Sequence, residues 1–117
     1  MSAGRFDLII EQGATYSQTF TYETAAGLPI NLTAYTAAMQ IRETAESDVV
    51  LATSGGSTPS ITLTLGGALG TIVVAMTAAK TALLSFDTAV YDLELTTGTT
   101  VIRLLEGEVK LSKEVTR

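Results

Sequence analysis

The stretch Val90-Tyr91-Asp92-Leu93-Glu94-Leu95-Thr96 alternates apolar and polar side chains and decides the fold class. Side chains of a β-strand point alternately to the two faces of a sheet, so this period of two predicts a strand with one buried and one wet face. We expect Tyr91, Leu93 and Leu95 to face the core, and Asp92 and Glu94 to face solvent. The stretch therefore predicts a sheet that covers a hydrophobic core on one side.

Short stretches of the same kind lie on both sides of this strand and are separated by turn-forming residues. The inward faces are expected to hold Phe6, Leu8 and Ile10, then Tyr16, Phe20 and Tyr22, then Ala37, Met39 and Ile41. Pro29 predicts a strand start or an edge position, because proline donates no backbone hydrogen bond. Gly107 is a candidate bulge within the last strand. The expected strands span residues 6–11, 15–22, 35–42, 49–52, 61–65, 71–76, 90–96 and 101–111.

The composition agrees with an all-β chain. Of 117 residues, 20 are Thr and 8 are Ser, and β-branched Thr favours strands and turns. The sequence predicts one short helix near 77–84, capped by Thr77, and a hairpin of 61–65 with 71–76 around the Gly-rich connection 66–70. We therefore expect a single domain over residues 1–117, folded as a two-sheet immunoglobulin-like β-sandwich of seven to eight strands.

Composition also excludes several classes of function. The chain has no His and no Cys, so we expect no enzyme, no catalytic residue, no cofactor and no metal ion. Its net charge of −5, with no Lys/Arg cluster, argues against nucleic acid as a partner. No secretory signal is expected at the start of the chain. Residues 49–79 are free of charge, but glycines and Thr alternation within them predict strands and not a membrane helix.

A few side chains could still form a site. Asp92 and Glu94 share a strand face, as paired catalytic acids or cation ligands would, but solvated acids on a wet face are the simpler interpretation. Arg42 and Arg103 are expected to pair across the sheet with Glu43, Asp92 or Glu94. The connection Gly66-Gly67-Ala68-Leu69-Gly70 lacks the Lys-Ser/Thr that a phosphate-binding loop requires.

The aromatic residues allow two interpretations. Tyr16, Phe20, Tyr22 and Tyr35 could form an exposed binding stripe. Because the chain has only 4 Tyr, 3 Phe and no Trp, the simpler expectation is that these side chains are needed in the core.

Five blocks of sequence resemble small structural proteins of tailed bacteriophages. Two of them, Pro29-Ile30-Asn31-Leu32-Thr33 and Tyr91-Asp92-Leu93-Glu94-Leu95, are also similar to the N-terminal immunoglobulin-like domain of phage baseplate and fibre-adaptor proteins. The resemblance implies an assembly role in the tail, baseplate or fibre attachment, with other virion proteins as partners. The five blocks span residues 11–16, 29–37, 91–95, 105–109 and 114–117.

The resemblance further implies a homo-oligomer in a symmetric ring, made in the host cytoplasm and located in the virion. The segments 2–10 and 109–117 are the expected contact regions, because chain ends are free to pair with neighbours. Two alternatives remain: a capsid decoration protein, and a carbohydrate- or host-surface-binding module. The second would use the aromatic residues together with Asp87, Asp92 and Glu94.

Overall fold

The computed structural model describes residues 4–55 and 59–116, and these residues form an all-β fold with one short α-helix. The first half of the chain holds β1 (Gly4–Arg5), β2 (Leu8–Glu11), β3 (Tyr16–Thr21), β4 (Thr36–Arg42) and β5 (Val50–Ser54). The second half holds β6 (Ser60–Leu65), η1 (Gly67–Leu69), β7 (Thr71–Met76), α1 (Ala78–Thr81), β8 (Thr88–Thr97) and β9 (Thr100–Ser112). The expected loop over 54–60 includes residues 56–58, which lie outside the described residues.

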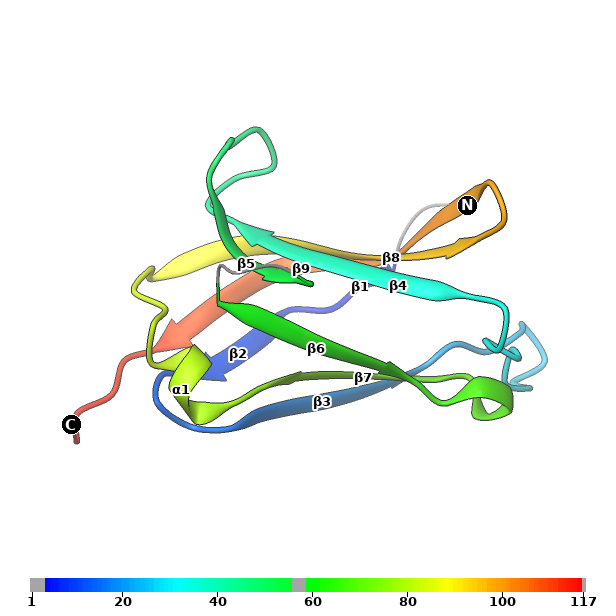
Figure 1. Cartoon of the computed structure of the whole chain (residues 1–117), viewed down its shortest axis with the longest axis horizontal. Coiled ribbons are helices and arrows are strands. Elements are labelled where there is room, and N and C mark those ends of the chain that lie inside the picture. Colours follow the sequence, from blue (N-terminus) through cyan, green and yellow to red (C-terminus); the bar gives the residue numbers. More distant parts are fainter. Residues whose placement is uncertain (1–3, 56–58, 117) are drawn as a thin grey trace.

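The strands follow one continuous hydrogen-bonded path, in the order β1-β9-β8-β4-β5-β6-β7-β3, and β2 also pairs with β9. In Figure 1, β4, β8 and β9 run along the top of the molecule and β6, β7 and β3 along the bottom. The two halves meet at a short parallel pairing, in which Thr53 lies opposite Ser60 and Ser54 opposite Ile61. The strands thus form one curled sheet whose halves face each other, and the separation into two sheets expected of an immunoglobulin-like sandwich is not complete.

The core lies between these two halves and follows the alternation in the sequence. Tyr91, Leu93 and Leu95 of β8 are buried, as expected, and their neighbours Asp92 and Glu94 are only partly buried. The remaining fully buried apolar side chains come from both halves: Leu8, Ile10, Leu32, Met39, Ile41, Ala52, Ile61, Ile72, Val74, Met76, Leu84, Ala89, Val109 and Leu111. Of the inward residues expected on the first strand, only Phe6 is exposed, at 41%.

The two ends of the chain pair with each other. Strand β9 has β8 on one edge, antiparallel, and the parallel strands β1 and β2 on the other. Gly4 lies opposite Leu105, and Leu8 to Glu11 lie opposite Val109 to Ser112. Residues 109–112 of the C-terminal segment expected to be free for contacts are therefore held in β9 beside β2, and residues 113–116 follow the end of β9.

The described residues form nine strands, against the seven to eight expected, because the short strand β1 precedes the first expected strand at 6–11. Phe6 and Asp7 separate β1 from β2, so β2 begins at Leu8 and not at Phe6. The Glu108 N–H donates to Asp7 Oδ1 at 2.9 Å, so a side chain replaces a backbone acceptor at this point. Gly107 lies opposite the interruption, where an added Cβ would collide with the Phe6 carbonyl oxygen. The bulge predicted at Gly107 is wrong: Gly107 pairs regularly with Tyr91, and the register of β9 shifts between Arg103 and Leu105.

The helix and the hairpin agree with the sequence. Thr77 caps α1 by accepting a hydrogen bond from the Lys80 N–H, and Ala82 ends the helix. Strands β6 and β7 form the expected antiparallel hairpin, with η1 in its connection. The described part of the uncharged stretch 49–79 includes β5, β6, η1, β7 and the start of α1. Within residues 4–55 and 59–116, no helix is long and apolar enough to cross a membrane.

Candidate functional site

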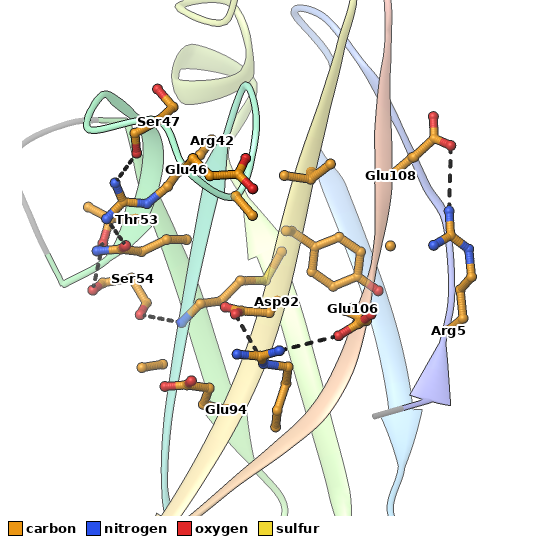
Figure 2. Close-up of a pocket in the computed structure, with 18 of the residues that line it drawn as sticks. Arg5, Arg42, Glu46, Ser47, Thr53, Ser54, Asp92, Glu94, Glu106 and Glu108 are labelled. Carbon is orange, nitrogen blue, oxygen red and sulfur yellow. Dashed lines mark hydrogen bonds and ion pairs between the residues drawn. The ribbon is translucent and has the colours of Figure 1, made fainter. Parts of the chain in front are cut away.

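One candidate site is a groove of about 860 Å³ on the outer, polar face of β4, β8 and β9. Strand β1 borders it on one side, and β5 with the β4–β5 loop borders it on the other (Figure 2). The alternation that buries Leu93 and Leu95 on the inner face places Asp92 and Glu94 on this outer face. The groove is therefore a direct consequence of the strand period.

Acidic groups outnumber basic groups in the groove. The carboxylates lining it are Glu46, Asp48, Asp92, Glu94, Glu106 and Glu108, and the cations lining it are Arg5, Arg42 and Arg103. This excess of negative charge suits a polar partner surface. Among the described residues, no group of three or more potential ligands is placed to hold a metal ion.

Each arginine of the groove already has partners. The Arg103 guanidinium lies 3.5 Å from Asp92 Oδ2 and 3.6 Å from Glu106 Oε1, and Figure 2 shows both carboxylates directed at it. Arg5 lies 3.3 Å from Asp7 Oδ1 and 3.5 Å from Glu108 Oε1. All these side chains are 40–61% exposed, so the pairs fix geometry more than they add stability.

The partners of Arg42 differ from those expected. The sequence predicts a carboxylate partner for Arg42, whereas its guanidinium donates to the Ser47 carbonyl oxygen at 2.6 Å and to Gln40 Oε1 at 2.9 Å. The bond to Ser47 ties the β4–β5 loop to the end of β4. Arg42 therefore holds the loop at the border of the groove, and the prediction for Arg103 with Asp92 is confirmed.

The aromatic side chains pack against the core. Tyr16, Phe20, Tyr22 and Tyr35 are all partly buried and contact the buried cluster. Phe20 also meets Phe6 edge to face, with ring centroids 5.1 Å apart. The structural interpretation of these residues is thus favoured over an exposed binding stripe, although Tyr22 also borders a small hollow with Val101, Ile102 and Arg103.

Asp87 lies apart from the acids of the groove. Its side chain is 92% exposed and lies 3.3 Å from Lys113 Nζ, and Asp87 does not line the groove. The structure therefore does not bring Asp87 together with Asp92 and Glu94, as the carbohydrate-binding alternative requires.

Two sheet edges form a second kind of candidate surface. The sequence instead predicts contact regions at the two chain ends. Among the described strands, β3 pairs with β7 alone, and β1 and β2 pair with β9 alone. The expected contact segments 2–10 and 109–117 include residues 2, 3 and 117, which lie outside the described residues. The sequence pattern predicted strand β3 itself, but sheet order, which makes it an edge, has no local signal.

Comparison with known proteins assigns the chain to no family. No protein-family model matches the chain, and no curated protein matches its sequence.

Proposed function

We propose that the chain is a structural component of a tailed bacteriophage particle, located in the tail, baseplate or fibre attachment and acting through protein–protein contacts. The observation that supports this role best is the edge strand β3, which pairs on one side only and has no charged residue, Pro or Gly. Solitary sheet proteins usually protect such an edge with Lys, Pro or a bulge, because an open edge accepts strands from other chains. An unprotected edge fits a protein that works in an assembly.

The blocks that resemble phage structural proteins also have clear positions in the fold. Tyr91–Leu95 forms the centre of β8, and residues 105–109 lie in β9 beside it. Residues 11–16 run from the end of β2 to the start of β3 and include the turn between them, where the Gly13 N–H donates to Thr81 Oγ1 at 3.0 Å. The resemblance thus involves strand and turn residues, and none of these blocks contains a catalytic motif, which fits an assembly role better than a chemical one.

The proposal assigns the chain other virion proteins as partners, a symmetric homo-oligomeric arrangement and a final location in the virion after assembly in the host cytoplasm. The acidic groove offers one docking face and the β3 edge another. Nucleic acid, membrane and cofactor have no part in this role.

Quantitative mass spectrometry of purified phage particles tests the proposal, with the copy number of this chain measured against the major capsid protein. About 6 or 12 copies per particle, as closed rings require, would support a tail, neck or baseplate position. Hundreds of copies would move the chain to the capsid surface as a decoration protein. Absence from the particle would overturn both structural roles.

A further inference from the structure

The free edge of β3 has a defined length. On its inner side, β3 pairs with β7 from Tyr16 opposite Met76 to Thr21 opposite Thr71. The chain on either side is held by its own hydrogen bonds: Ala14 N–H to the Glu11 carbonyl at 3.1 Å, and Tyr22 N–H to the Gly70 carbonyl at 2.8 Å. Between these points, residues 16–21 make no backbone bond to another described segment on their outer side.

The direction of the backbone groups follows from strand alternation. In a strand, the N–H and C=O of one residue point to the same edge, and those of the next residue to the opposite edge. Because Tyr22 directs its N–H towards the β7 side, the even-numbered residues of β3 do the same. The backbone N–H and C=O groups of Ser17, Thr19 and Thr21 therefore point to the free edge, away from β7. The side chains of these three residues are exposed.

The opposite edge of the sheet is less suited to strand addition. It consists of β1 and β2, is interrupted at Phe6 and Asp7, and bears Arg5, Asp7 and Glu11. Charges and irregularities of this kind discourage pairing with another chain. To the other described residues, the side chains of β3 make one hydrogen bond, a weak one from Gln18 Nε2 to the Thr19 carbonyl at 3.4 Å.

We propose that β3 pairs with β3 of a second copy of this chain, antiparallel about a two-fold axis at Thr19, so that the sheets of both copies join into one. Residues opposite each other in an antiparallel pair share a face and, when their polar groups face each other, exchange two hydrogen bonds. With the axis at Thr19, Thr19 meets its own copy and Ser17 meets Thr21 in both directions. All three outward residues then find a partner, which gives six hydrogen bonds on the antiparallel rule.

The side chains fit the same arrangement. The outer face of the joined strands would have Ser and Thr opposite Thr, a pairing that stabilises antiparallel strands. No like charges meet, because β3 has no charged residue. This self-complementarity favours a second copy as the occupant, since an isologous interface requires one surface to match itself. The inference rests on the proposed assembly role and deepens it by naming one surface and its partner.

Sedimentation velocity and native mass spectrometry of the full chain over a concentration series test the pairing. We expect the wild type to dimerise, and Thr19→Lys to weaken dimerisation by about tenfold or more, because two lysines would meet at the axis. Thr62→Lys is the matched control, since Thr62 is an exposed threonine on β6, which lies inside the sheet. This control should dimerise like the wild type, and circular dichroism verifies that each variant is folded.

A mixture of Thr19→Lys with Thr19→Glu locates the axis. If residue 19 meets its own copy, the mixture forms a heterodimer while each variant alone is weakened. A monomeric wild type, a Thr19→Lys dimer as tight as the wild type, or a mixture that forms no heterodimer would overturn the inference. Particle composition is a separate measurement: a monomer found in phage particles overturns the pairing alone, and a dimer absent from particles overturns the proposed function alone.

Discussion

Two tyrosines show how a single hydroxyl group can stabilise or destabilise the same core. The Tyr91 hydroxyl donates to the Phe6 carbonyl oxygen at 2.5 Å and holds the chain where β1 ends and β2 begins. The Tyr16 hydroxyl is buried and has no partner among the described residues. A buried polar group without a partner destabilises the folded state, whereas a buried polar group that is hydrogen-bonded stabilises it.

Removal of each hydroxyl should therefore have opposite effects. We expect Tyr16→Phe to raise the free energy of unfolding by about 1 kcal/mol and Tyr91→Phe to lower it by about 1 kcal/mol. Urea denaturation followed by circular dichroism measures both. Equal loss of stability in the two variants would contradict this difference between the hydroxyls.

The same tyrosines predict a loss of stability in alkali. Burial raises the pKa of Tyr16 from 10.0 to about 12. Burial also raises the pKa of Tyr91, Tyr16 and Asp7 raise it further, and Arg5 lowers it. Between pH 10 and about pH 12, Tyr16 is deprotonated in the unfolded state but keeps its proton in the folded state. The free energy of unfolding therefore falls as the pH rises from 10 towards 12. Denaturation over this range should show a shallower fall in the Tyr16→Phe variant, and an unchanged slope would refute the assignment to Tyr16.

At the scale of elements, α1 fixes the turn between β2 and β3 through one buried residue. Thr81 is fully buried, and its hydroxyl accepts from the Gly13 N–H at 3.0 Å and lies 2.8 Å from the Ala14 carbonyl oxygen. We expect Thr81→Val to lower the free energy of unfolding by about 2 kcal/mol, because the isosteric change leaves both backbone groups unpaired. Thr81→Ser keeps the hydroxyl and should lose less; a serine variant as unstable as the valine variant would show that packing, and not hydrogen bonding, is the cause.

The close approach of β9 to the N-terminal segment depends on Gly107, which has no side chain. A Cβ at position 107 would overlap the Phe6 carbonyl oxygen, which also accepts the Tyr91 hydrogen bond. Gly107→Ala should therefore destabilise the fold by about 1–3 kcal/mol, as overpacking typically does. Lys110→Ala, at an exposed position of the same strand, is the control for thermal denaturation. Equal melting temperatures of the two variants would contradict this close approach.

The strands and the local hairpin of β6 with β7 could be predicted from sequence, but the pairing of strands far apart in the chain could not. The alternation of apolar and polar side chains over residues 90–96 correctly predicted that Tyr91, Leu93 and Leu95 are buried, because a period of two is a local property of the chain. The pairing of β2 with β9 joins segments about a hundred residues apart, and nothing local in either segment names the other. For the same reason the Arg103–Asp92 pair was predictable from strand spacing, whereas the bond from Arg42 to Ser47 depends on how the β4–β5 loop folds back.

At the scale of the whole molecule, the closure of the fold by its two ends predicts unequal effects of truncation. Leu8 and Ile10 of β2 are buried beside Val109 and Leu111, so removal of residues 1–11 would expose one side of β9 and open the core. We expect this truncated chain to lose cooperative unfolding in urea, because a small domain has only a few kcal/mol of stability to lose. Removal of residues 115–117 leaves every described strand intact, because β9 ends at Ser112, and Val115 is 92% exposed, so the unfolding midpoint should hardly change. A cooperative transition in the chain without residues 1–11 would show that the remaining strands fold without the parallel pairing, and that the N-terminal strands only cover an edge.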